Sequence, residues 1–145
     1  MTFSILAYDP ITESYGGASA TGNICVGGLV LRGNPLSGVS ASQGSEPSTL
    51  WGENILKYTG DGLDAEAAIY KTIRKDKGKE RRQLSVIDKK GNSSVFSGKE
   101  NSSIIDEIID IIGPNARIYC TGGEPSLVKK TTKLLEVLLK VITTM

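Results

Sequence analysis

The sequence predicts an α+β fold, because its extended and helical segments come in separate runs. Four extended segments of small or apolar residues fill most of residues 1–44, and helical periodicity begins only after residue 47. Two extended segments, a helical one, another extended one and a final helical one follow. Strands that succeed one another through short turns favour antiparallel hairpins. We therefore expect sheets that are buried on both faces, by each other and by helices.

The composition is that of one ordinary globular domain over residues 1–145. Apolar residues make up 39% of the chain and charged residues 23%, and the formal net charge is +1. This balance gives no reason to expect a nucleic-acid partner or a membrane surface. No apolar run approaches the ~20 residues of a spanning helix, and no secretory segment opens the chain. We therefore expect a cytoplasmic protein.

The chain contains no histidine, which excludes Ser-His-Asp and Cys-His catalysis and histidine-ligated zinc. Its two cysteines, Cys25 and Cys120, show no CxxC spacing. We expect them to be buried free thiols, with a disulfide between them as the open alternative. We expect neither a metal nor a cofactor. The base of any hydrolase built on this chain must then be a carboxylate, an amine or a hydroxyl.

The first eight residues are predicted to form a strand with at least one buried face, which Asp9 and Pro10 end in a turn. A small residue at position two normally allows removal of Met1, which would leave Thr2 with the free α-amine. That amine, which titrates near pH ~8, can serve as the base for the Thr2 hydroxyl. The alternative is that Thr2 is simply an early residue of the strand.

Six further segments, each bounded by turn-forming residues, are predicted to be strands. They are residues 16–21, 24–31, 37–44, 83–88, 93–97 and 117–121. The run 24–31 is largely apolar, which favours a buried strand. Residues 89–92 are expected to form the turn of a second hairpin.

Four segments are predicted to be helices, over residues 48–60, 63–75, 102–112 and 124–143. Ser48 and Asp64 are the expected N-caps of the first two. The leucines of the last helix are spread more widely than a single narrow stripe. That helix is expected either to contact a second subunit in a homo-oligomer or to cover the chain's own core.

Several short motifs, in order, resemble those of the N-terminal-nucleophile (Ntn) hydrolases, and in particular the uncharacterised family known as domain of unknown function 1028. The residues that carry the resemblance are Thr2-Phe3-Ser4-Ile5 with Ala7 and Asp9-Pro10, the segment 16–21, Val26-Gly27, Gly38-Val39 with Ala41 and Gln43, Arg82-Gln83-Leu84 with Val86 and Asp88, Gly91, and Ser97-Gly98. They cover about the first two-thirds of the chain. Residues 99–145 agree less well and read as a shortened or divergent last third.

The resemblance implies a four-layer αββα sandwich, distantly similar to proteasome β subunits, with Thr2 as nucleophile and base. Backbone N–H groups of Ser42, Gln43 and Gly44 would form the oxyanion hole. Arg32 is the only cation on the strand that carries a lysine in proteasome β subunits. Where proteasome β subunits have an aspartate on the second strand, this chain has the hydroxyl residues Ser19 and Thr21.

The expected function is hydrolysis of a small-molecule or peptide amide through an acyl-enzyme, with Arg82 and Gln83 binding a carboxylate or amide of the substrate. Each of these roles has an ordinary structural alternative. Arg32 could be an exposed residue at a strand end, and Ser19 and Thr21 could be polar residues of a paired strand. Arg82 and Gln83 could form an ordinary pair at the edge of a strand. The alternative function is a non-catalytic binding or assembly protein of the same fold. A third, weaker possibility is a domain that binds a small ligand at Gly122-Gly123, directly ahead of the last helix.

Overall fold

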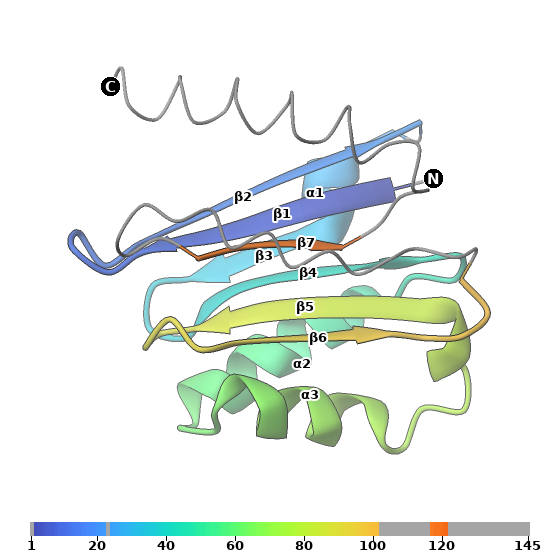
Figure 1. Cartoon of the computed structure of the whole chain (residues 1–145). Helices are drawn as coiled ribbons and strands as arrows, with labels where there is room; N and C mark the ends of the chain where they lie inside the picture. The colour runs from blue at the N-terminus through green and yellow to red at the C-terminus, as the bar shows by residue number, and fades with distance from the viewer. Residues whose placement is uncertain (1, 23, 102–116, 122–145) are drawn as a thin grey trace.

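The computed structural model describes residues 2–22, 24–101 and 117–121 (Figure 1). In chain order the elements are β1 (Thr2–Asp9), β2 (Ser14–Thr21), α1 (Val26–Val30), β3 (Leu31–Asn34), β4 (Gly38–Gly44), α2 (Thr49–Gly60), α3 (Ala65–Ile73), the 3-10 helix η1 (Lys79–Arg81), β5 (Arg82–Asp88), β6 (Ser93–Ser97) and β7 (Arg117–Thr121). The helices expected over 102–112 and 124–143, and the Gly122-Gly123 step, lie outside the described residues.

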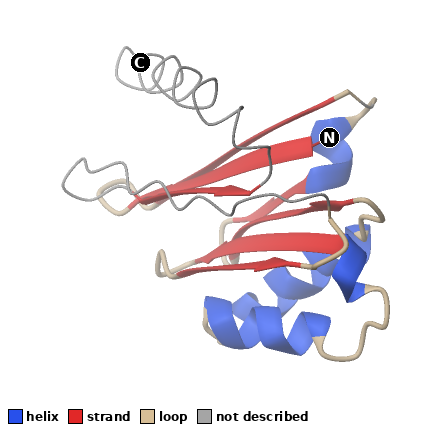
Figure 2. Cartoon of the chain, turned by 45° about the vertical axis from the view of Figure 1, so that its right-hand side comes forward, coloured by secondary structure: helices blue, strands red, loops and turns tan. Residues whose placement is uncertain are grey.

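The strands form two antiparallel sheets, one with the order β2-β1-β7 and one with the order β3-β4-β5-β6. The first sheet is stacked on one face of the second, and α2 and α3 cover the other face of the second sheet (Figures 1 and 2). The expected mixed α+β architecture with paired antiparallel sheets is therefore confirmed. The fourth, outer helical layer of the expected sandwich would fall on residues outside the described ranges.

Alternation along the strands divides the apolar side chains between two cores. The core between the two sheets consists of Leu6, Val30, Val39, Ala41 and Ile87. The core between the second sheet and the helices consists of Trp51, Ile55, Leu56, Ala65, Ala68, Ile69, Leu84 and Val86. Neighbours on β5 therefore point in opposite directions, Ile87 towards the first sheet and Val86 towards the helices. This alternation decides which polar residues can meet between the sheets.

Most predicted elements agree with the structure, and β6 and β7 have the predicted bounds. Ser48 and Asp64 occupy the N-cap positions of α2 and α3. The Asp64 carboxylate accepts a hydrogen bond from the Ala67 N–H at 2.8 Å, whereas the Ser48 side chain makes no capping bond. The aspartate therefore stabilises its helix start as predicted, and the serine does not.

The prediction of a buried strand over residues 24–31 is wrong. Residues 26–30 form the short helix α1, and only Leu31–Asn34 belong to a strand. Ile24 is 85% exposed and Leu29 is 52% exposed, so this apolar run is not a core strand. A short apolar run does not distinguish helix from strand by periodicity alone, and two adjacent glycines weaken it as a strand.

The expectation for the cysteines is also wrong in part. Cys25 is a free thiol, but it is exposed rather than buried. It directly precedes α1 with a left-handed backbone conformation, φ 57°. The thiol is exposed because the segment that carries it is not a core strand.

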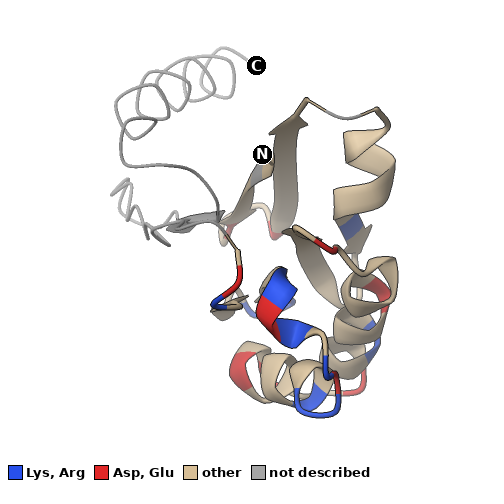
Figure 3. Cartoon of the chain, turned by 90° about the vertical axis from the view of Figure 1, so that its right-hand side faces the viewer, with Lys and Arg blue, Asp and Glu red and all other residues tan. Residues whose placement is uncertain are grey.

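Charged side chains are distributed unevenly over the fold. Residues 14–31, which include β2 and α1, contain no Lys, Arg, Asp or Glu. Charged residues gather instead on α2, α3 and the turns around η1 (Figure 3). Within the described part of the chain, no helix is both long and apolar enough to cross a membrane.

Candidate active site

Thr2 lies at the start of β1, directly opposite Thr21 in the antiparallel register of β1 and β2. Their hydroxyl oxygens are 2.9 Å apart and form a hydrogen bond. Thr2, Ser4 and Leu6 share one face of β1, and Leu6 belongs to the core between the sheets. The Thr2 side chain therefore lies on the face that looks towards the second sheet, at the half-buried end of the inter-sheet space.

Gln43, near the end of β4, connects the two sheets at this position. Its side-chain Nε2 donates to the backbone carbonyl of Thr2 at 3.1 Å, and its Oε1 accepts from the Ser4 hydroxyl at 2.9 Å. The residue is only 1% exposed. A buried amide needs such partners, because an unsatisfied buried polar group costs about 1–3 kcal/mol.

Gln83 of β5 stands directly opposite Gln43 in the β4–β5 register. It accepts a hydrogen bond from Gln43 Nε2 at 3.2 Å and donates through its own Nε2 to the Ser97 hydroxyl at 2.8 Å. It is also 1% exposed. We call the group of Thr2, Ser4, Thr21, Gln43, Gln83 and Ser97 the hydroxyl–amide cluster.

Ser19 lies beside the hydroxyl–amide cluster without joining it through a hydrogen bond. It stands opposite Ser4 in the β1–β2 register, two residues before Thr21 and on the same face of β2. Its Oγ is buried and has no hydrogen-bond partner in the described part of the chain. The structure thus brings Thr2, Thr21 and Ser19 to one end of the first sheet.

The segment Ser42–Gly44 has one edge without a strand neighbour among the described strands. β3 pairs with β4 only as far as Ala41, whereas β5 pairs with β4 through Gly44. The Ser42 hydroxyl faces the helices and donates to the Ser48 carbonyl at 2.7 Å. Any contribution of Ser42 to a site between the sheets must therefore come from its backbone.

Arg32 is not placed beside Thr2. Its Nη1 donates to the carbonyls of Gly28 and Leu31 at 2.6 and 2.8 Å, and its Nε lies 3.7 Å from a carboxylate oxygen of Glu53 on α2. In the β3–β4 register it stands opposite Ser40, whose hydroxyl donates to a carbonyl of α2. Strand alternation therefore turns Arg32 towards the helices, away from the inter-sheet space.

Arg82 and Gln83 point to opposite faces of the second sheet, as successive strand residues do. Arg82 Nε donates to Asp76 at 3.0 Å, and its guanidinium lies over the Trp51 ring, 5.8 Å from the centroid. Gln83 instead points into the hydroxyl–amide cluster. The guanidinium of Arg82 is thus held on the helical side of the second sheet.

Two members of the cluster, Ser4 and Ser97, were not predicted as site residues. Ser4 could have been found from the sequence, because it lies two residues after Thr2 and a strand places such residues on one face. Ser97 could not, since its position depends on the β5–β6 register, which sets it opposite Gln83. Sheet pairing, rather than any local motif, completes the cluster.

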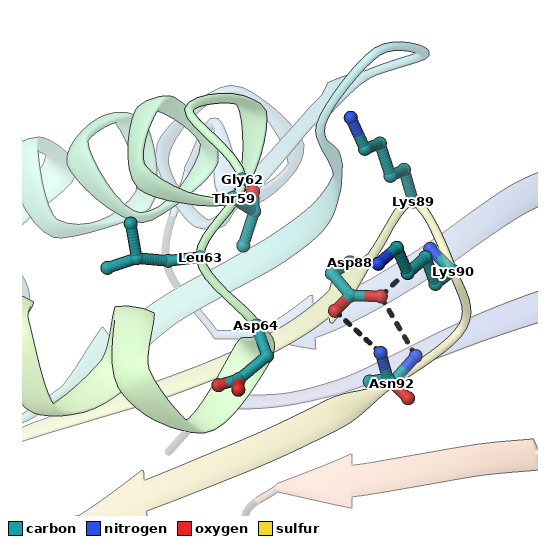
Figure 4. A pocket seen from close by; sticks show the side chains of 8 residues that line it. All are labelled: Thr59, Gly62, Leu63, Asp64, Asp88, Lys89, Lys90 and Asn92. Carbon is teal, nitrogen blue, oxygen red and sulfur yellow. Dashed lines mark hydrogen bonds between the residues drawn. The ribbon is translucent and has the colours of Figure 1, made fainter.

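Two cavities formed by described residues lie at the other end of the sheets. One, of about 300 Å³, lies between the α2–α3 connection and the β5–β6 turn (Figure 4). Its buried Asp88 carboxylate accepts from the Lys90 N–H, the Asn92 N–H and the Asn92 side-chain amide, so it holds the turn together. The other, of about 430 Å³, lies between the start of β2 and the β3–β4 turn. Neither cavity includes Thr2.

These features define a mixed α+β protein whose two antiparallel sheets enclose a hydroxyl–amide cluster at the end where the first strand begins. The chain belongs to the family of unknown function DUF1028, whose profile matches residues 2–115. The resemblance to the DUF1028 family, predicted from the short motifs, is therefore confirmed. No curated protein matches the chain.

A solved structure of the same family has a similar fold. The crystal structure of protein SPO2555 from Silicibacter pomeroyi, described as belonging to DUF1028, is 42% identical in sequence and superposes with a TM-score of 0.77. The match covers 91% of the present chain and 60% of that protein's chain. The present chain thus spans about three-fifths of the length of this relative.

Proposed function

We propose that this chain is an Ntn-type hydrolase that cleaves an amide bond, with Thr2 as the nucleophile. The observation that carries the proposal is the placement of Thr2 at the start of β1, with its hydroxyl hydrogen-bonded to Thr21 and its carbonyl bound by the buried Gln43. A stacked pair of antiparallel sheets with helices on an outer face also supports an Ntn-like αββα sandwich. Such an architecture holds the first strand residue in place, where a free chain end would fray.

The proposed reaction begins after removal of Met1, when the α-amine of Thr2 is free. The amine takes the proton of the Thr2 hydroxyl, and the oxygen attacks the substrate carbonyl. Backbone N–H groups on the unpaired edge of Ser42–Gly44 would stabilise the oxyanion. The amine then protonates the leaving nitrogen, which leaves an ester on Thr2. A water molecule, deprotonated by the same amine, hydrolyses this ester and releases the carboxylic acid.

The proposed mechanism differs from the expected one in its electrostatics. Arg32 lies on the far face of the second sheet, and within the described residues no charged side chain is hydrogen-bonded to Thr2. An α-amine titrates near pH ~8 without any partner, which is close enough to neutrality for it to act as a base. The Thr21 hydroxyl would orient the nucleophile in place of an acidic residue.

The test combines intact-mass spectrometry with a β-lactone, an electrophile that acylates an activated hydroxyl. We expect the native protein to lack Met1 and to gain one acyl group, which Thr2→Ser retains and Thr2→Ala loses. Thr49→Ala, which alters an exposed threonine at the start of α2, is the matched control and should be acylated like the native protein. Permanent retention of Met1, or an undiminished adduct in Thr2→Ala, would contradict the proposal.

A non-catalytic binding or assembly protein is the second candidate. It is favoured by one observation: the hydrogen-bond partner of the Thr2 hydroxyl is another neutral hydroxyl, that of Thr21. On this alternative, Thr2→Ala would leave the cellular role of the protein unchanged. The expected homo-oligomer rested on residues 124–143, outside the described ranges, and stays a prediction that light scattering tests.

A further inference from the structure

We infer that Gln43 and Gln83 form a positioning pair that orients Thr2, and that Gln83 does not contact the substrate. The inference rests on the proposed function, because it concerns the same nucleophile. Both amides are 1% exposed and are hydrogen-bonded to each other at 3.2 Å. A side chain so deeply buried, with both ends of its amide bonded within the protein, is not available to recognise a substrate.

The hydrogen bonds determine how the amide groups of Gln43 and Gln83 are oriented. The Thr2 carbonyl can only accept, so the group of Gln43 that faces it must be the donor Nε2. The Oε1 of Gln43 is then left for the Ser4 hydroxyl. Since Gln43 Nε2 also donates to Gln83 Oε1, the Nε2 of Gln83 faces Ser97. Gln83 thus stabilises the one orientation of Gln43 that can bind Thr2.

Gln43 gives the start of β1 a hydrogen-bond partner from the second sheet. β1 pairs with β2 from Thr2 onwards, but its pairing with β7 begins only at Ser4. The side chain of Gln43 supplies a donor for the Thr2 carbonyl. Thr2 is therefore held from the first sheet by Thr21 and from the second sheet by Gln43. Such fixation matters because a displacement of about 1 Å can slow an enzymatic reaction about 100-fold.

The experiment measures the rate of β-lactone acylation of the full chain between pH 6 and 9, by intact mass. Gln83→Leu removes the acceptor for Gln43 and should slow acylation about 10-fold. Gln83→Glu keeps an acceptor at that position, whether ionised or not, and should restore most of the rate. Gln43→Glu, once ionised, has no donor for the Thr2 carbonyl and places a negative charge near the α-amine, which raises the pKa of the amine. It should slow acylation and move the rising limb of the pH profile upwards by about one unit.

Val86→Ala is the matched control, because Val86 lies on the same strand as Gln83 but faces the helices. It should lower the melting temperature while the acylation rate and its pH profile stay at the native values. Native rates and profiles in folded Gln83→Leu and Gln43→Glu would overturn the inference, as would an equal slowing in Val86→Ala. Acylation of the native protein separates the two proposals: its complete absence overturns the proposed function, and the inference with it.

Discussion

At the scale of single residues, the hydroxyl–amide cluster is organised by the side on which each side chain emerges from its strand. Thr2, Gln43 and Gln83 face the inter-sheet space, whereas Arg32 and Arg82 face the helices. The two arginines point away from the hydroxyl–amide cluster for the same reason, since each is next in sequence to a residue that points between the sheets. Residue type suggested the candidates, and the face of the sheet on which each side chain emerges determines which of them are in contact.

Alanine substitutions of Ser19 and Ser4 should change the stability of the protein in opposite directions. Ser19→Ala removes a buried hydroxyl that has no hydrogen-bond partner in the described residues, so we expect it to raise the free energy of unfolding by about 1 kcal/mol. Ser4→Ala removes the hydroxyl that donates to the buried Gln43 and should lower the free energy of unfolding by about 1–2 kcal/mol. Urea unfolding measures both. A clear loss of stability in Ser19→Ala would show that its hydroxyl has a partner.

At the scale of elements, the end of β4 depends on a glycine. Gly44 has φ 132°, and an added Cβ would lie 2.5 Å from the Arg81 carbonyl oxygen and 2.9 Å from Asn101 Oδ1. We expect Gly44→Ala to lower the free energy of unfolding by about 2 kcal/mol or more, because both the backbone conformation and the contact are unfavourable.

Gly62 provides the control for that substitution. It has φ 99° but nothing within 4 Å of an added Cβ. Gly62→Ala therefore isolates the conformational cost, about 1 kcal/mol. Equal losses in the two variants, measured by urea unfolding, would show that the close contact at Gly44 contributes nothing.

The β1–β2 turn should respond to pH through Asp9. The Thr12 hydroxyl and then the Ile11 N–H donate to its carboxylate and hold the pKa of Asp9 below its usual range. A lowered pKa in the folded state stabilises the turn above the unfolded pKa of about 4, and this effect is lost as the pH falls through the folded value. NMR titration should show a higher Asp9 pKa in Thr12→Val. Ser14→Ala, which leaves both donors in place, should not change it.

At the scale of the whole molecule, the second sheet is shared by two cores, so we expect one cooperative unfolding transition. Leu6→Ala opens the core between the sheets, and Ile55→Ala opens the core under the helices. Both side chains are fully buried, and each substitution should lower the free energy of unfolding by about 2–5 kcal/mol. Emission from Trp51, the only tryptophan, and circular dichroism should give coincident curves. Separate transitions would show that the two cores unfold independently.

Much of the local structure can be predicted from the sequence alone. Alternation in residues 1–8, the turn at residues 89–92 and the cap at Asp64 predicted elements that the structure contains, because strand, turn and helix-start preferences act between near neighbours. The same preferences were ambiguous for residues 24–31, where a short apolar run fits either a strand or a helix.

Packing of the two sheets, in contrast, determines which of the predicted residues lie together. Gln43 and Gln83 meet because β4 and β5 pair in one register, and Gln43 reaches Thr2 because the first sheet lies on the face of the second that carries both amides. A one-residue change of register would turn each of these side chains to the other face, although no local preference would change. Contacts between residues about 40 positions apart depend on this stacking, and no single segment of the sequence specifies it.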